Sequence, residues 1–485
     1  MIFTSIAFAI FLPVVFFIYW FATKGSFKLQ NILLLVSSYF FYGCWDWRFL
    51  FLLFFSTSLD FVSGIKIYSS KNEQTKKFWF WLSIFINLGF LGVFKYYNFF
   101  ASSLADGLST LGIHANLWTL NVILPVGISF YTFHGLSYVI DIYNNKIQPE
   151  RNLINYAVFV SFFPLLVAGP IERATHLLPQ ITKKREFNYS KAVDGMRQIL
   201  WGLFKKIVVA DNCAECVNQI FNTSQTQSGS MLLLGAVLFS FQIYSDFSGY
   251  SDIAIGTSKL FGIDLLRNFS FPYFSRDIAE FWRRWHISLT SWLRDYLYIP
   301  LGGSRGAKLK VIRNTLIIFL VSGFWHGANW TFIAWGGFHA LLFLPLLVFN
   351  KNRKNIDTVA FERSLPNFKE LFQMLSTFFL VSVGWVFFRS ETIWQAIEYI
   401  KKAFQFNSNY FDVSTFSRSG NLSSFTIFFS ILSVMILIII EWIQRQKSHG
   451  LDISTQKGRW PIYITLCLLI YVCKGGSSAF IYFQF

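Results

Sequence analysis

The sequence is poor in charge, since only 14% of its 485 residues are Asp, Glu, Lys or Arg. A soluble domain carries roughly 25% charged residues, so this composition excludes an ordinary soluble protein. Hydrophobic residues make up 54% of the chain, with 60 Phe and 17 Trp among them. Apolar blocks of about 20 residues, enough to cross a hydrocarbon core of about 30 Å, recur along the whole length. The sequence therefore predicts an all-α polytopic membrane protein.

Cysteine is also scarce. The five cysteines are an odd number, which does not fit a full disulfide framework. Cys213 and Cys216 form a CxxC pair, but no second pair or nearby histidine supplies the four ligands that structural zinc usually takes. We therefore expect no metal site, and we interpret both cysteines as small apolar packing residues.

Several functional signatures are missing as well. The chain has no His-x4-Asp acyltransferase box, no GxSxG elbow and no P-loop, so serine-hydrolase and NTPase readings lack support. Its net charge is +17, but the Lys and Arg residues lie mainly in short polar segments between apolar blocks. That distribution is typical of membrane topology and of contact with anionic lipid, so we expect no nucleic-acid partner.

Apolar windows predict about 11–12 transmembrane helices. The windows are Ile2–Phe21, Gln30–Trp45, Arg48–Tyr68, Phe78–Tyr97, Asn121–Tyr143, Asp194–Ile220, Ser230–Phe261, Ile312–Trp330, Thr331–Phe349, Phe368–Phe388, Phe425–Trp442 and Ile462–Val472. The first window has no basic residue before it and no small-residue cleavage site after it. It is followed by Lys24 and Lys28, so we expect a retained first helix with its N-terminus outside.

The block Leu153–Pro170 does not fit a full crossing. Basic segments flank it on both sides, and it contains Pro164, Gly169 and Pro170, which are unsuited to a straight spanning helix. We expect it to enter and leave the membrane on the cytoplasmic face. Such backbone is tolerated at membrane depth only beside protein or a water-filled cavity, so a cavity is implied.

A basic but Trp- and Leu-rich segment lies between Arg267 and Arg313. Three-and-four spacing within it predicts one apolar helical face. The residues of that face are Trp282, Trp285, Leu289, Trp292 and Tyr296. We expect one amphipathic helix that lies along the membrane or dips into it, with His286 on it.

The stretch SGFWHGANW, Ser322 to Trp330, places a histidine between two apolar runs. His326 lies thirteen residues beyond Arg313, which at 1.5 Å per residue is about 20 Å up a helix, past the membrane midplane. Asn329 at i+3 and Trp330 at i+4 share its helical face. A neutral imidazole there can act as a general base. The alternative, a buried histidine bonded to a helix carbonyl, is equally compatible with its position.

Other polar residues in apolar sequence have simpler explanations. For His286 an interfacial histidine beside an aromatic belt is the competing interpretation, and for His134 and His339 we favour helix packing. Asp246 and Asp252 lie in YSDFSGYSD among small residues. A proton relay is one interpretation of these acids, and structural pairing with arginines of the basic segment is the more economical one.

Two motifs then carry a family resemblance. EFWRRWHISLTSWLRDYLYIPLGGSRG, followed by FWHGANWTFIAWGGFH, resembles the membrane-bound O-acyltransferase (MBOAT) family. YSDFSGYSDIAIG and the terminal FIYFQF resemble its bacterial alginate O-acetyltransferase branch. D-alanyl transferases of teichoic acid share the motifs on shorter chains. The resemblance implies a single domain over residues 1–485, with a catalytic core at about 121–349 and a helical bundle around a central funnel or tunnel.

The resemblance also implies roles for residues. His326 matches the essential histidine of the family and His286 its second polar partner, which would bind the thioester carbonyl or orient the acceptor. Asn329, Trp325 and Trp285 become candidate substrate-binding residues. A covalent acyl-histidine is an open variant. No tightly bound cofactor is expected, and the donor would be acetyl-CoA or another acyl thioester.

The expected acceptor is an exported, alginate-like polysaccharide, reached through an extracytoplasmic SGNH-type partner. The expected location is the bacterial cytoplasmic (inner) membrane. Two other function classes stay open. A carrier or channel for the acyl donor or glycan would use the same intramembrane polar groups without making bonds. A scaffold for a polysaccharide synthase would tolerate loss of both His286 and His326.

Overall fold

The structure of the protein, a computed structural model, describes residues 1–114, 118–120, 123–167, 169–406, 410–411, 424–453, 458–473 and 480–481. All regular elements in these ranges are helical and none is a strand, which confirms the all-α class. The chain divides into two compact units. Unit 1 comprises Met1–Met196 and Ala254–Leu266, and unit 2 comprises Arg197–Ile253 and Arg267–Phe485.

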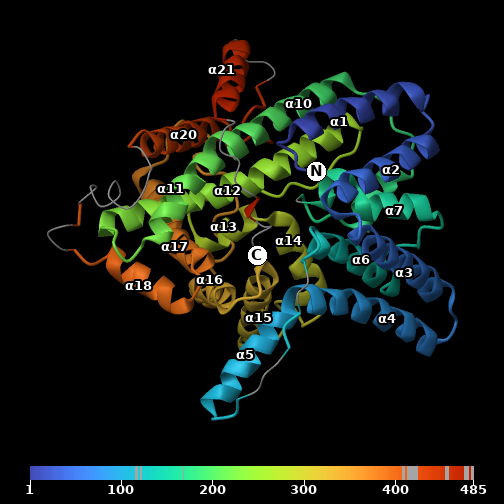
Figure 1. Cartoon of the computed structure of the whole chain (residues 1–485), viewed down its shortest axis with the longest axis horizontal. Helices are drawn as coiled ribbons and strands as arrows, with labels where there is room; N and C mark the ends of the chain where they lie inside the picture. The colour runs from blue at the N-terminus through green and yellow to red at the C-terminus, as the bar shows by residue number, and fades with distance from the viewer. Residues whose placement is uncertain are drawn as a thin grey trace. The chain divides into compact units, whose positions relative to one another are not determined.

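Unit 1 holds the N-terminal helices, drawn from blue to teal in Figure 1. They are α1 (Ile6–Phe17), α2 (Phe27–Asp46), α3 (Phe49–Ser69), α4 (Glu73–Leu91), α5 (Tyr97–Thr110), α6 (Ile128–Tyr143), α7 (Leu153–Ser161), α8 (Phe163–Leu166) and α9 (Ala174–Ile181). Helices α10 (Tyr189–Leu203) and α12 (Gly229–Leu260) contribute residues to both units.

A buried carboxyl group sits where α3, α4 and α6 pack together. Asp60 accepts hydrogen bonds from Ser83 Oγ at 2.6 Å and from Asn87 Nδ2 at 2.8 Å. Gly135 of α6 leaves space for it, because a Cβ there would lie 1.9 Å from Asp60 Oδ2. Polar side chains inside apolar helix bundles are stabilised by such mutual hydrogen bonds, so this cluster ties α4 to α3, while α6 packs closely against it at Gly135.

The block expected to re-enter the membrane is a broken helix. α7 ends at Ser161, Phe162 interrupts the helix with ψ 114, and α8 begins at Phe163 with Pro164 in its first turn. Behind it, His134 lies with Nδ1 3.4 Å from Val160 O and accepts from the Glu172 amide at 3.2 Å. The break confirms that no straight helix spans residues 153–170, and the packing of His134 is as expected. The re-entrant course stays a prediction.

Unit 2 contains the remaining helices. They are α11 (Asp211–Asn222), α13 (Ile278–Arg284), α14 (Ile287–Leu293), α15 (Lys308–His326), α16 (Trp330–Val348), α17 (Phe368–Arg389), α18 (Ile393–Ala403), α20 (Ser424–Ile443) and α21 (Arg459–Val472). Across both units, six helices in the described ranges are long and apolar enough to cross a membrane. The protein is therefore a multi-pass membrane protein, and the larger count of 11–12 crossings stays a prediction.

Asp246 and Asp252 on α12 are paired, but not with the arginines that we expected. Lys206 Nζ lies 2.8 Å from Asp246 and 2.8 Å from Asp211, and Lys205 Nζ lies 2.5 Å from Asp252. Both lysines come from a π-helical turn between α10 and α11. A π turn inserts an extra residue into the helix, and this turn presents two successive lysines to α12. The expected structural pairing is present, and the choice of partner was wrong.

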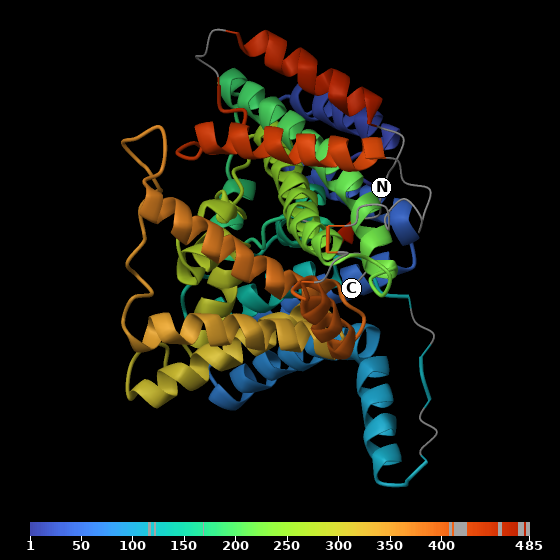
Figure 2. The ribbon, with the colours of Figure 1, turned by 90° about the vertical axis from the view of Figure 1, so that its left-hand side faces the viewer.

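Gly323 and Gly336 allow α15 and α16 to pack closely. Figure 2 shows these two helices, in yellow and gold, side by side. A Cβ at Gly323 would lie 2.3 Å from Phe332 O, and a Cβ at Gly336 would lie 2.3 Å from Phe319 O. Small residues allow membrane helices to approach this closely. The contact fixes the end of α15, where His326 lies.

Candidate active site

His326 is the last residue of α15 and is 3% exposed. Gly327 follows in an extended conformation, so the helix does not continue. The helical count from Arg313 to His326 is therefore right, while the expectation that Asn329 and Trp330 share the face of His326 was wrong. Asn329 instead caps the next helix, with Oδ1 accepting from the Thr331 amide at 3.0 Å and Nδ2 donating to Glu391 O at 3.0 Å.

His286 lies at a sharp corner between α13 and α14. Its φ is 44°, in the left-handed region, and its side chain is 1% exposed. The single amphipathic helix expected across Trp282–Tyr296 is therefore two short helices, because the chain reverses its local twist at His286. Residues other than glycine adopt this conformation at a cost of about 1–3 kcal/mol, and such strain clusters at functional sites.

The corner brings His286 toward His326. The two imidazole centroids lie 6.4 Å apart with their planes at 59°. Trp325 lies against both rings, with centroids 5.7 Å from His286 and 4.9 Å from His326. Phe247 of α12 covers the other side of His286 at 4.7 Å. The two histidines singled out from the sequence thus belong to one buried site.

Aromatic rings form the wall behind His326. Trp335 and Phe388 lie 5.1 Å and 5.4 Å from its ring. Trp285 packs on Trp385 at 4.9 Å. Of the three candidate substrate-binding residues, the structure brings Trp325 against both histidines, while Asn329 caps α16 and Trp285 packs on Trp385. Their roles in binding substrate stay predictions.

Asn268 is the residue of this site that sequence reasoning missed. It is fully buried, its Oδ1 lies 2.9 Å from Nδ1 of His286, and Oδ1 also accepts from Ser288 Oγ at 2.9 Å. It belongs to an irregular segment before α13 and carries no periodic signal. Its sequence neighbours do not distinguish it from other polar loop residues, so only the tertiary contact reveals it.

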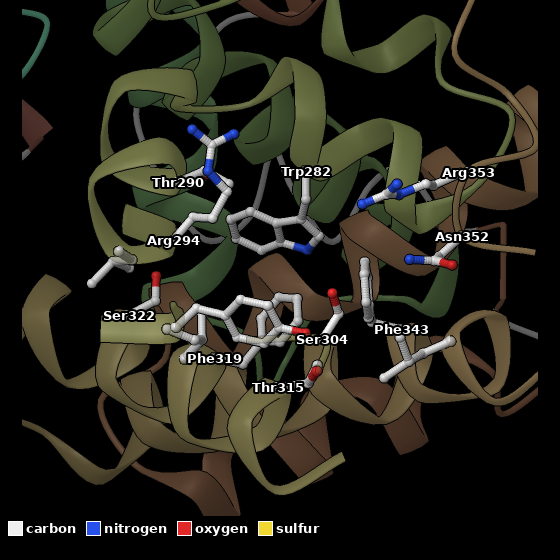
Figure 3. Close-up of a pocket in the computed structure, with 14 residues that line it drawn as sticks. Trp282, Thr290, Arg294, Ser304, Thr315, Phe319, Ser322, Phe343, Asn352 and Arg353 are labelled. Atoms are coloured by element: carbon white, nitrogen blue, oxygen red, sulfur yellow. The ribbon is translucent and has the colours of Figure 1, made fainter. Parts of the chain in front are cut away.

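Unit 2 also contains a cavity of about 260 Å³ (Figure 3). Its lining includes Trp282, Phe319 and Phe343, with Arg294 and Arg353 among the polar residues. Ser322, also in the lining, lies one helical turn before His326 on α15. Trp282 packs on Trp335 at 5.6 Å, and Trp335 packs on His326. The cavity is thus linked to His326 through Trp282 and Trp335, and its lining includes neither histidine. The cavity expected beside the block Leu153–Pro170 stays a prediction, because no residue of that block lines this one.

His339 lies behind the site, fully buried between Trp282 and Trp335, with ring centroids 5.1 Å away in each case. This agrees with the packing role expected for it. Cys213 and Cys216 are buried and reduced. Within the described ranges, no group of three or more His, Cys, Asp or Glu residues is arranged to hold a metal ion.

Residues 143–383, which include Asn268, His286 and His326, match the family model described as MBOAT, membrane-bound O-acyltransferase family. The chain belongs to this family and is a membrane-bound O-acyltransferase. Its relatives include the probable alginate O-acetylase AlgI of Pseudomonas aeruginosa, to which it is 36% identical over 90% of this chain and 81% of the relative. It is 33% identical to the peptidoglycan O-acetyltransferase of Helicobacter pylori, over 93% and 91% of the two chains. The teichoic acid D-alanyltransferase of Bacillus subtilis is 27% identical over 55% of this chain and 69% of its own.

Proposed function

We propose that the protein takes an acetyl group from a cytoplasmic thioester donor and passes it across the bacterial inner membrane, for O-acetylation of an exported polysaccharide. One observation carries the proposal: two buried imidazoles, His286 and His326, lie with ring centroids 6.4 Å apart. A cavity large enough for a slender substrate reaches Trp282, which packs on the Trp335 ring beside His326. The names of two relatives, probable alginate O-acetylase and peptidoglycan O-acetyltransferase, support an acetyl group and a polymeric acceptor.

The cavity suits the arm of a thioester donor such as acetyl-CoA. Its inner lining is mainly aromatic and aliphatic, which favours an uncharged chain. Arg294, Asn352 and Arg353 supply cationic and amide donors on its lining, and guanidinium groups bind phosphate with charge-assisted hydrogen bonds. In this arrangement the phosphate of the donor stays near the arginines while the thioester extends toward the histidines.

The chemistry is direct acyl transfer from sulfur to oxygen. The oxygen of an acceptor hydroxyl bonds to the thioester carbonyl carbon while its proton passes to an imidazole of the pair. The carbon–sulfur bond then breaks, its electron pair goes to sulfur, and the proton moves on to the departing thiolate. Positioned proton transfer of this kind contributes about 10²–10⁴-fold, and holding both reactants in one site adds proximity. The sequence favours His326 as the base.

Delivery of the acetyl group to the polysaccharide involves a second protein. An SGNH-type acetyltransferase outside the membrane would receive the acetyl group and place it on the polymer. An N-terminus outside, with the Lys24–Lys28 segment in the cytoplasm, orients the protein for a cytoplasmic donor. Anionic lipid headgroups would contact the basic cytoplasmic segments.

Purified protein in detergent with labelled acetyl-CoA and a hydroxyl acceptor tests the proposal. We expect labelled acetyl ester and free thiol from the wild type, and from a His114→Ala control that changes an exposed histidine. A carrier or channel would give no product in detergent and would move label only into a sealed vesicle. Transfer from a D-alanyl thioester but not from acetyl-CoA would instead support the teichoic acid reaction.

A further inference from the structure

The side-chain amide of Asn268 is engaged on both of its ends. Its Oδ1 faces Nδ1 of His286 and Oγ of Ser288, each at 2.9 Å, while its Nδ2 donates to Ser251 Oγ at 3.2 Å. The backbone is held as well, because the Ile287 amide donates to Asn268 O at 2.9 Å. In this arrangement the oxygen of the amide faces His286.

This orientation selects one tautomer of His286. An amide oxygen can only accept a hydrogen bond, so Nδ1 of His286 carries the proton. A neutral imidazole has one protonated and one unprotonated nitrogen, which leaves Nε2 with a free lone pair. Burial lowers the pKa of His286 to about 3, so the ring is neutral throughout the physiological range.

The lone pair at Nε2 of His286 is available to accept a proton. Nε2 of His286 is buried and accepts no hydrogen bond from the part of the chain that the structure describes. A buried polar atom without a partner is unfavourable, and the left-handed backbone of the same residue adds strain. The centroids of the His286 and His326 rings lie 6.4 Å apart, a separation compatible with one oxygen atom that is hydrogen-bonded to both rings at N–O distances of about 2.8–3.0 Å.

We propose that Asn268 is a positioning residue that holds His286 as the proton acceptor for the acceptor hydroxyl. The inference rests on the proposed function and deepens it by assigning the hydroxyl proton to His286, where the sequence favoured His326 as the base. A ring with an unprotonated Nε2 cannot donate to the thioester carbonyl, so that role falls away for His286. The hydroxyl proton moves to Nε2 of His286 as the new carbon–oxygen bond forms. His326 is then the ring left to face the thioester, and the proton ends on the thiolate after the carbon–sulfur bond breaks.

Two variants of one residue test this division. Asn268→Asp keeps an acceptor oxygen at Nδ1 and adds a negative charge, so activity is retained and the acid limb of the pH–rate profile moves to higher pH. Asn268→Leu removes the hydrogen-bond acceptor at Nδ1 of His286, so the proton can occupy either ring nitrogen. We expect kcat to fall by about 10²-fold, the low end of what a general base contributes. His326 is a titratable side chain packed against His286, so each profile is also recorded in a His326→Gln background.

Asn314→Leu is the matched structural control. Asn314 is also a fully buried asparagine in unit 2, but its Nδ2 donates to the carbonyls of Leu301 and Gly303 and it touches neither histidine. We expect Asn314→Leu to lower the melting temperature and to leave the shape of the pH–rate profile unchanged. Asn268→Leu with wild-type kcat and pH profile overturns the inference. The proposed function fails separately, if the wild type itself transfers no acyl group from thioester to hydroxyl.

Discussion

His286 and His326 lie with ring centroids 6.4 Å apart, although one sits at a helix corner and the other at a helix end. Each position depends on a local break in regular structure. His286 takes a left-handed backbone conformation between α13 and α14, and Gly327 ends α15 directly after His326. Because the side chains at such breaks are not confined to one helical face, they can converge on a common space from different helices.

The His326→Ala variant is expected to insert and fold but to lose acyl transfer by about 10²–10⁴-fold, because it removes an imidazole from the reacting centre. Thiol release from acetyl-CoA by the detergent-solubilised protein measures the loss. His114→Ala, which changes an exposed histidine, is the control for purification and assay. Wild-type turnover by a folded His326→Ala protein would assign this histidine to packing.

Arg353→Ala is expected to raise KM for the thioester donor about fivefold and to change kcat little. Arg353 lines the cavity and is exposed, and an exposed ion pair contributes up to about 1 kcal/mol. The effect should shrink in high salt, because screening weakens the same interaction in the wild type. Lys351→Ala removes a nearby exposed cation outside the cavity lining and serves as the control. Equal changes in both variants would point to a general surface-charge effect.

Gly336→Ala is expected to destabilise the protein by about 1–3 kcal/mol, the usual range for overpacking. Its new Cβ would lie 2.3 Å from the backbone oxygen of Phe319, which cannot move away without shifting α15. Gly337→Ala is the matched control, because the nearest atom to a Cβ there is Leu320 Cδ2 at 3.8 Å. Thermal unfolding in detergent compares the two variants. Similar melting temperatures for both would show that α15 and α16 are not closely packed at Gly336.

Stability is expected to fall as pH rises above about 6.5, through loss of one ion pair in unit 1. Nδ1 of His176 lies 2.8 Å from the buried carboxylate of Glu172, and this hydrogen bond raises the pKa of His176 against the opposing effect of burial. A group with a raised folded pKa contributes fully below its unfolded pKa and loses that contribution as pH passes the folded value. Melting temperatures measured from pH 6 to 9 should therefore decline in the wild type.

The His176→Gln variant tests that cause, because glutamine keeps a hydrogen-bond donor without titrating. Its melting temperature should depend less on pH than that of the wild type over the same range. His114→Gln, at an exposed position, should keep the wild-type slope. An unchanged slope in His176→Gln would assign the pH dependence to other groups.

Helix boundaries were predictable where the local signal was strong. The windows Arg48–Tyr68 and Phe368–Phe388 agree closely with α3 and α17, because a long apolar run in a membrane has few alternatives to a helix. The apolar stripe from Trp282 to Tyr296 predicted one helix where there are two. Hydrophobic periodicity does not reveal a single residue with a left-handed backbone, such as His286. The broken block before Gly169 was foreseen from its prolines, whose effect on a helix is local.

The sequence by itself determined the class of protein, the helical membrane-spanning architecture, and the two histidines worth examining, since composition and short motifs carry that information. Only the tertiary structure decided that the rings of His286 and His326 pack together and that Asn268 is hydrogen-bonded to Nδ1 of His286. It also decided that Lys205 and Lys206 form ion pairs with the aspartates of α12. These contacts join residues whose spacing along the chain follows no helical period. They depend on how helices pack, which is set by the summed fit of many side chains and not by any one segment.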